Sequence, residues 1–309
     1  MRLGVLDIGS NTVNLLVVDA HTGARPVTSV SERSVVRLMR FLEPDGSISA
    51  QGVGELEQAI RRARAVADEQ AVDALVTIAT SALRDARNGA DLIRRIETIS
   101  GVPLQVLDGP EEARLTFLAI RRWFGWSAGE ILMIDIGGGS LEIAAGPDEA
   151  PAVALSLPFG AGRLTMSHLM PDDPPRPERL AALAEFLDEH LGTARDMMTG
   201  RPAPDHVVGS SKTIRSLAKL AGHALPGWAG NERLVLSRAR LKDWIPRMAA
   251  MSADARQNLP GITPERTYQI VGGALVLNAT MKALGVAELE VSPWALREGV
   301  LLRYLDTVG

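Results

Sequence analysis

The chain has 309 residues, a formal net charge of −4 and no cysteine. This length suits two domains of ordinary size, and the hydrophobic fraction of 46% can fill their cores. The negative charge argues against a general nucleic-acid surface, and the lack of cysteine excludes disulfides, zinc–thiolate sites and a thiol nucleophile. The N-terminus lacks a signal-peptide pattern and no apolar run approaches a membrane span, so we expect a cytoplasmic protein that binds no membrane.

The first half of the chain is predicted to alternate between strands and helices, as expected for an α/β domain. It opens with a strand pair over residues 2–19 that turns at the segment Asp7-Ile8-Gly9-Ser10. Apolar spacing and turn signals then predict a strand within 27–40, a helix over 51–70, strands over 74–80 and 103–107, and helices over 90–99 and 109–124.

Two charged residues follow predicted strands of this first half. Ligands of open α/β sheets gather beyond the carboxyl ends of strands, where the planar guanidinium of Arg84 could bind two phosphate oxygens. A salt bridge from Arg84 to Asp85 or Asp91 is an equally good explanation. Glu112 lies in the first turn of a helix that Asp108 can cap, and stabilisation of the positive helix end would also explain its charge.

The segment 125–129 is predicted to link two domains, 1–124 and 125–309, and the terminal helix, about 295–309, could pack back on the first. The second half is predicted to contain a hairpin over 131–146, strands over 153–157, 206–208 and 289–291, and helices over 178–199, 237–251 (interrupted at Pro246), 263–284 and 295–305.

The hairpin ILMIDIGGGSLEIAAG repeats the pattern of the N-terminal strand pair. Asp135-Ile136-Gly137-Gly138 parallels the segment at Asp7, and each follows an apolar strand, which suggests two related domains. Three glycines permit positive φ and close approach of a ligand, and their N–H groups can form a nest for phosphate oxygens. Asp135 and Glu142 would repel phosphate unless a divalent cation lies between them. A glycine-rich hairpin with solvent-facing acids is the simpler alternative.

The segment Gly209-Ser210-Ser211-Lys212-Thr213 follows a short strand and opens a helix, an arrangement that binds anions. It lacks the spacing of a P-loop. A simple serine cap would explain Ser210 or Ser211. It would leave Lys212 at the positive end of the helix, which mildly favours phosphate binding.

The sequence resembles the exopolyphosphatase/guanosine-pentaphosphate phosphohydrolase (Ppx/GppA) family, within the actin-like/Hsp70/sugar-kinase superfamily, over essentially its whole length. The matching segments are DIGSNT (7–12), SALRDA (81–86), DGPEEARLTF (108–117), IDIGGGSLEI (134–143), GSSKT (209–213), LPGITPER (259–266) and VSPWALREGVL (291–301). The resemblance implies two actin-like (ribonuclease H-like) α/β domains with a phosphate-binding cleft between them, and a short form without an appended helical domain.

The resemblance also implies roles for individual residues. Glu112 matches the general base that acts on water, and Asp135 and Glu142 match carboxylates that hold Mg²⁺ or Mn²⁺, with Asp7 as a further candidate ligand. The residues expected to face phosphate are Ser10, Asn11, Arg84, Gly137, Gly138, Gly139, Ser140, Ser211, Lys212 and Arg266. The chain departs from the common family pattern at Asn14, Lys212 and Tyr268, which affects the expected chain-length preference and metal choice.

The implied reaction is in-line attack of water on a terminal phosphoryl group of inorganic polyphosphate. The alternatives are a guanosine pentaphosphate 5′-phosphohydrolase, a regulator that binds polyphosphate or alarmone without turnover, and an actin-like kinase or ATPase. The intact Glu112, Asp135 and Glu142 argue against the regulator. The family resemblance alone suggests a homodimer.

Overall fold

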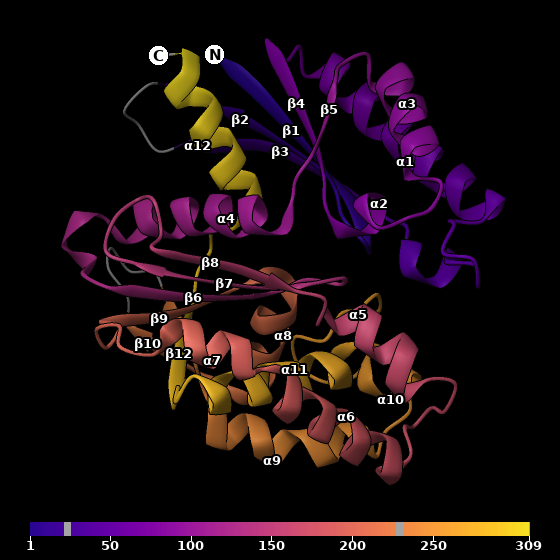
Figure 1. Ribbon diagram of the computed structural model, residues 1–309. Coiled ribbons are helices and arrows are strands. Elements are labelled where there is room, and N and C mark those ends of the chain that lie inside the picture. Colours follow the sequence, from indigo (N-terminus) through magenta and orange to yellow (C-terminus); the bar gives the residue numbers. More distant parts are fainter. Residues whose placement is uncertain (22–25, 227–231, 309) are drawn as a thin grey trace. The chain divides into compact units, whose positions relative to one another are not determined.

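The computed structural model describes residues 1–21, 26–226 and 232–308, and these fall into two compact units (Figure 1). The first unit comprises Met1–Leu115 and Leu296–Gly309, and the second comprises Thr116–Ala295. The division lies inside helix α4 (Gly109–Phe124), and helix α12 (Leu296–Val308) belongs to the first unit. The domain boundary after residue 124 stays a prediction.

The first unit is built on a five-stranded sheet with the order β3-β2-β1-β4-β5. Strands β1, β2 and β3 are antiparallel neighbours, whereas β4 and β5 run parallel to β1. The strands span Arg2–Ile8 (β1), Thr12–Asp19 (β2), Val27–Val35 (β3), Ala74–Ala79 (β4) and Leu104–Val106 (β5).

Helices cover both faces of this sheet because side chains along each strand alternate between them. One face of β1 and β2, with Leu6 and Ile8, packs in a core with α1 and α3, whereas Leu3 and Val5 on the other face pack with Val300 of α12. The helices on the first face are η1 (Leu38–Phe41), α1 (Ala50–Glu69), α2 (Ser81–Arg84) and α3 (Gly89–Ser100).

Gly299 allows α12 to approach the backbone of α4 within the first unit. A Cβ atom at this position would lie 1.9 Å from the carbonyl oxygen of Leu115, so the backbone would have to move. We therefore expect Gly299→Ala to lower the free energy of unfolding by about 3 kcal/mol or more, measured by urea denaturation. Gly54→Ala is the control: Gly54 lies inside α1 with open space around it, so alanine there should be neutral or stabilising. Equal destabilisation by both variants would contradict the packing argument.

The second unit is built on a seven-stranded sheet with the order β10-β11-β12-β9-β6-β7-β8. Strands β6, β7 and β8 are antiparallel neighbours, and β9 and β12 run parallel to β6. The strands span Ile131–Ile136 (β6), Leu141–Gly146 (β7), Val153–Leu157 (β8), His206–Ser210 (β9), His223–Pro226 (β10), Glu232–Ser237 (β11) and Glu288–Val291 (β12).

One face of β6 and β7 packs into a large apolar core with most helices of this unit (Figure 1). Leu132, Ile134 and Ile143 point into that core, so the alternate residues Met133, Asp135 and Glu142 lie on the opposite face. The helices of the second unit are the remainder of α4, η2 (Trp126–Ala128), α5 (Ala161–Leu164), η3 (a π-helical turn, Thr165–Leu169), α6 (Pro177–His190), α7 (Gly192–Met198), α8 (Ser211–Ala221), α9 (Arg238–Ala249), α10 (Ala253–Arg256) and α11 (Ile270–Ala283).

The two units share one topology. Strands β1 to β5 correspond in order, direction and pairing to β6, β7, β8, β9 and β12. The internal repeat predicted from the two Asp-x-Gly turns is confirmed by this correspondence of strands. The strand pair β10–β11 is an addition to the second sheet that the sequence analysis did not predict.

Three predicted helices differ from those observed. The helix expected over 178–199 is divided into α6 and α7 at Leu191, which precedes the weak helix former Gly192. Helix α9 continues through Pro246 without interruption. The helix expected from Thr263 begins only at Ile270, after a series of turns. Across the described ranges, every helix is too short or too polar to cross a membrane.

Candidate active site

In the first unit, three parallel strands end side by side and present the predicted residues at one edge of the sheet. The last residues of β1, β4 and β5 are Ile8, Ala79 and Val106, and they are direct neighbours in the strand register. The N–H group of Leu107 donates to the carbonyl of Ala79 at 2.9 Å, which joins the segments that follow β4 and β5. The edge therefore gathers the turn after Ile8, helix α2 and the start of α4.

The turn after β1 is a compact hairpin held by backbone hydrogen bonds. The N–H of Gly9 donates to the carbonyl of Thr12 at 3.0 Å, and the carbonyl of Asn11 accepts from the N–H groups of Val36 and Arg37 at 2.9 Å each. The side chains of Ser10 and Asn11 are buried. The predicted residues of this turn are thus held in place by the backbone.

Arg84 and Glu112 occupy the segments that follow β4 and β5. The Arg84 guanidinium donates to the carbonyl of Leu107 at 2.8 Å, and its Nε lies 3.3 Å from Asp85. The alternative of a salt bridge to Asp85 is therefore observed. These contacts anchor the arginine at the strand edge. Glu112 is half-buried in the first turn of α4, whose N-cap is Asp108: the Asp108 carboxylate accepts from the N–H of Glu111 at 2.7 Å.

The second unit presents a row of polar side chains across four neighbouring strands. Asp135 on β6 lies directly opposite Glu142 on β7, and the next pairs in the row are Glu142 with Ser156 and Asp135 with Ser210. The Ser156 hydroxyl donates to Glu142 at 2.8 Å, and the Ser210 hydroxyl donates to Asp135. Glu142 is only 1% exposed, so the alternative of two solvent-facing acids is wrong for this residue.

A divalent cation fits the donor set of Asp135 and Glu142. Two carboxylates on adjacent strands, one of them buried, repel each other unless a positive charge or a proton compensates them. Hard carboxylate oxygens are the ligands that Mg²⁺ prefers, and Mg²⁺ commonly takes only one or two of them beside phosphate oxygens and water. No group of three or more potential metal-ligating side chains occurs among residues 1–21, 26–226 and 232–308.

The corresponding pair in the first unit carries one charge instead of two. Asp7 lies opposite Asn14, whose side-chain amide donates to the Thr12 hydroxyl at 2.9 Å. Asn14 thus occupies the place that Glu142 has in the second unit. The predicted metal ligand Asp7 and the pair on β6 and β7 belong to different compact units.

Packing within the protein does not require glycine at Gly9, in the turn after β1, or at Gly137, in the turn after β6. Neither Gly9 nor Gly137 has a positive φ, so Gly137 does not use the left-handed conformation that the three glycines were expected to permit. A Cβ atom at Gly9 would meet only the carbonyl of Thr12, at 3.4 Å, and one at Gly137 only the carbonyl of Ser140, at 3.5 Å. These are ordinary contact distances, which the fold could accommodate.

Gly160, by contrast, is required by close packing against the turn of residues 137–140. The N–H of Ala161 donates to the carbonyl of Gly137 at 3.0 Å, and the Arg163 N–H and side chain donate to Gly138 and Gly139, both at 2.9 Å. A Cβ atom on Gly160 would lie 2.3 Å from the carbonyl carbon of Gly139. The start of α5 therefore fixes the glycine turn through its carbonyl groups.

We expect Gly160→Ala to displace this turn and to reduce both stability and activity. The loss of unfolding free energy should be about 3 kcal/mol, measured by urea denaturation, because a methyl group must enter space already filled by backbone. Gly192→Ala is the matched control in the same unit, since the nearest atom to its added Cβ would be 3.9 Å away. If Gly160→Ala unfolds like the wild type, the close contact does not constrain the turn.

The predicted residues Ser211, Lys212 and Arg266 meet at the start of α8. Ser211 has a φ of 76°, a left-handed conformation that is uncommon outside glycine, and its hydroxyl accepts from the N–H of Ile214 at 3.3 Å. Arg266 is buried and donates to the Thr213 hydroxyl at 3.0 Å. A strained backbone of this kind is often found at binding sites.

Several contributors to the site were missed in the sequence. Ser156 donates to Glu142, and Thr213 accepts from Arg266. Both contacts depend on how strands and helices pack in the folded chain. Arg256 is 1% exposed and donates to the carbonyls of Met248 and Thr267, at 2.8 and 2.9 Å, which fixes the segment that carries Arg266. Burial lowers the pKa of the Arg256 guanidinium. The nearest signals in the sequence were the segment LPGITPER (259–266) and the helix predicted from Thr263, and neither includes Arg256.

The described residues thus form two similar sheet edges, one in each unit, with tight turns and helix starts at the carboxyl ends of parallel strands. The fold and these edges define a duplicated α/β protein suited to phosphate chemistry. The chain belongs to the Ppx/GppA phosphatase family, whose model matches residues 16–308.

Named relatives and solved structures agree with this assignment. The chain is 48% identical to Exopolyphosphatase 1 of Mycobacterium tuberculosis over 99% of its own length and 89% of the relative's, and equally identical to that of Mycobacterium leprae. It is similar to the crystal structure of an exopolyphosphatase from Cytophaga hutchinsonii, with 27% identity, a TM-score of 0.87 and coverage of 100% and 99% of the two chains. The Aquifex aeolicus family member has 25% identity, a TM-score of 0.78 and coverage of 99% and 98%. The predicted class, an α/β fold with two similar domains, is confirmed by the two sheets and by these structures.

Proposed function

We propose that the protein is an exopolyphosphatase that hydrolyses the terminal phosphate of inorganic polyphosphate. The observation that carries the proposal is the pair of Asp135 and Glu142, which lie opposite each other beside a glycine turn. Membership of the Ppx/GppA family and 48% identity to proteins named Exopolyphosphatase 1 support the same reaction class, a phosphoric anhydride hydrolase.

Inorganic polyphosphate presents only phosphoryl groups, so its recognition needs N–H donors and cations without a pocket for a base or sugar. The turns after β1 and β6 supply backbone N–H groups, and the space over Gly9 and Gly137 would admit phosphate oxygens that a side chain would exclude. Ser10, Asn11 and Gly138 to Ser140 would complete these turns. Arg84, Lys212 and Arg266 would neutralise the charge of the bound chain, with Ser211 as a further donor.

Glu112 would act as the general base. In the proposed reaction its carboxylate takes a proton from a water molecule whose oxygen attacks the terminal phosphorus in line with the bridging oxygen. The bond to the bridging oxygen breaks, and the products are orthophosphate and a chain one unit shorter. Donors aimed at the equatorial oxygens, from Arg84 and the glycine turns, stabilise the charge of the transition state.

Asp135 and Glu142 would hold Mg²⁺ or Mn²⁺ in the second unit, and Asp7 is the candidate ligand of the first unit. Such an ion neutralises phosphate charge and polarises the oxygens it binds. Guanosine pentaphosphate is a second candidate substrate, and a homodimer and a cytoplasmic location remain predictions from the sequence and the family resemblance.

The direct test is the release of phosphate from long-chain polyphosphate, tripolyphosphate, guanosine pentaphosphate and ATP, each with Mg²⁺, Mn²⁺ or EDTA. We expect metal-dependent release that is fastest from polyphosphate and leaves chains shortened from their ends on a gel. Faster release from guanosine pentaphosphate would assign the alternative substrate. Binding of polyphosphate without any release would refute the hydrolase and favour a regulator.

A further inference from the structure

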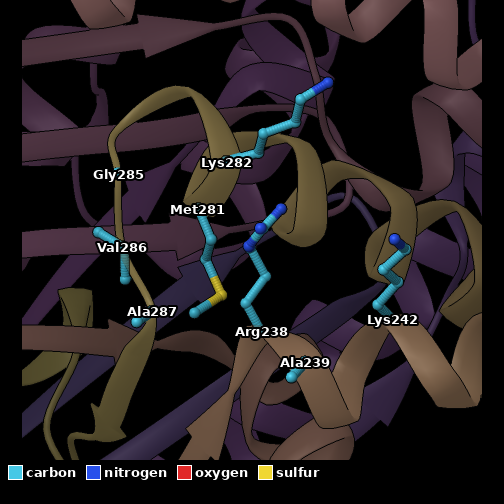
Figure 2. A pocket seen from close by; sticks show the side chains of 8 residues that line it. All are labelled: Arg238, Ala239, Lys242, Met281, Lys282, Gly285, Val286 and Ala287. Atoms are coloured by element: carbon cyan, nitrogen blue, oxygen red, sulfur yellow. The ribbon is translucent and has the colours of Figure 1, made fainter.

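The second unit contains a cavity of about 450 Å³ that the proposed reaction does not use (Figure 2). It lies where the start of α9, the end of α11 and the segment leading into β12 meet. The lining residues are Arg238, Ala239, Lys242, Met281, Lys282, Gly285, Val286 and Ala287. Its volume is within the usual range for sites that bind small molecules.

The cavity lies at the opposite edge of the sheet from the candidate active site of this unit. Val286 and Ala287 precede the amino end of β12, whereas Ser292 follows its carboxyl end and donates to the carbonyl of Gly209, beside the start of α8. The four residues of β12 separate the two edges by about 13 Å at the usual rise per residue. A small ligand in the cavity would therefore not touch the phosphate turns.

The lining is positively charged. Lys282 is engaged by Asp188, with 2.6 Å between the amino nitrogen and the carboxylate oxygen. Arg238 and Lys242 are one helical turn apart on α9, and neither forms an ion pair with a carboxylate within the described part of the chain. The lining contains no acidic residue, so the half-buried Arg238 and the exposed Lys242 give it a positive charge. A dianion would balance their two charges.

The remaining wall is apolar. Met281 is 0% and Val286 6% exposed, so the accessible apolar surface comes mainly from Ala239 and Ala287. Figure 2 shows the Arg238 side chain lying between Met281 and Lys242. The backbone carbonyls at the end of α11 already accept hydrogen bonds: Met281 from the N–H of Val286 at 2.8 Å, and Lys282 from that of Gly285 at 3.2 Å. Because these acceptors are occupied, they add little negative potential to the wall, which can cover an apolar group.

We propose that this cavity binds a small organic phosphate monoester. The dianionic phosphate would lie between Arg238 and Lys242. The organic part would lie against Ala239, Ala287 and the small accessible part of Val286. Inorganic phosphate or a short polyphosphate would satisfy the two cations without using the apolar wall. The proposed ligand class is therefore defined by charge and apolar surface together.

The chain offers a selective probe of this site, because it contains only four lysines: Lys212, Lys219, Lys242 and Lys282. Acetylation by a limiting amount of an N-hydroxysuccinimide ester, followed by peptide mass spectrometry, reports the reactivity of each one. Adenosine 5′-monophosphate is a suitable ligand, with adenosine, inorganic phosphate and tripolyphosphate as comparisons. We expect adenosine monophosphate to protect Lys242, with half-protection on the order of 1 mM or below, while the exposed Lys219 reacts as before.

Two variants on α9 make the result specific. Arg238→Gln should raise the half-protecting concentration by about tenfold, because it removes a charge-assisted contact. Arg240→Gln should leave it unchanged, since Arg240 is exposed on the same helix and does not line the cavity. The proposal is overturned if adenosine monophosphate does not protect Lys242 at about 10 mM, well above the expected Kd. It is also overturned if phosphate protects Lys242 equally well, since the site would then be only a cluster of cations.

Discussion

Replacing Glu112 with glutamine is expected to lower the rate of phosphate release from polyphosphate by about two to four orders of magnitude, the usual contribution of a general base. Glutamine retains the size of the side chain and its place in the first turn of α4, but it cannot accept a proton from water. Binding of polyphosphate should persist, because the proposed phosphate contacts belong to other residues. Release is measured at saturating substrate and binding by fluorescence anisotropy of a labelled chain.

Glu111→Gln is the matched control for this variant. Glu111 is the preceding residue in the same helical turn, and it forms an ion pair with Arg303, which also donates to Gln105 at 3.0 Å. Loss of this partly exposed pair should cost less than about 1 kcal/mol of stability and leave kcat unchanged. If both variants lose activity equally, or if Glu112→Gln remains active, Glu112 is not the base.

Neutralising Glu142 should have opposite effects on activity and on the stability of the metal-free protein. Glu142→Gln keeps an oxygen that can accept the 2.8 Å hydrogen bond from Ser156, but it removes one of two neighbouring charges. In EDTA we expect the melting temperature to rise by about 3 °C, since repulsion with Asp135 is relieved. With Mg²⁺ we expect kcat to fall by about a hundredfold and the Mg²⁺ concentration for half-maximal activity to rise.

A thermal titration separates this cation role from a purely structural one. Wild-type protein should gain stability with added Mg²⁺, as any ligand of the native state produces, and the gain should be smaller in Glu142→Gln. Glu185→Gln, on the exposed face of α6, should match the wild type in both measurements. If metal-free Glu142→Gln is less stable than metal-free wild type, then neighbouring protein groups alone compensate the charge of the Glu142 carboxylate. That result would contradict the cation role.

Local sequence patterns predicted the fold where an element is defined by its own residues. The two Asp-x-Gly hairpins and the helix over α1 follow from strand patterning and helical periodicity, and both are observed. The segment after Thr263 shows the limit of this reasoning. Its threonine, proline and glutamate are typical of a helix start, yet the carbonyl of Thr267 accepts from the side chain of Arg256 and the helix begins at Ile270. That contact comes from tertiary structure, which helix-cap rules do not include.

The sequence predicted the charged residues of the candidate site. It did not predict the side chains that form hydrogen bonds to them. The hairpin spacing places Asp135 opposite Glu142, and the Asp-x-Gly repeat identifies the two turns. The hydroxyl groups of Ser156 and Ser210 approach these carboxylates only because β8 and β9 flank the hairpin. Similarly, the sequence around Arg256 gives no local sign that this side chain is buried. Such residues are defined by strand order and packing.

The chain enters the second unit at residue 116 and returns to the first at residue 296, which affects folding during synthesis. Leu3, Val5 and Leu16 lie in one core with Val300 and Leu301 of α12. During synthesis, the first unit cannot complete that core until α12 has been made, which is after every residue of the second unit. The usual N-terminal-first order of domain folding is therefore reversed at the final step. Until then the nascent chain exposes an apolar sheet face, and we expect chaperones to bind there.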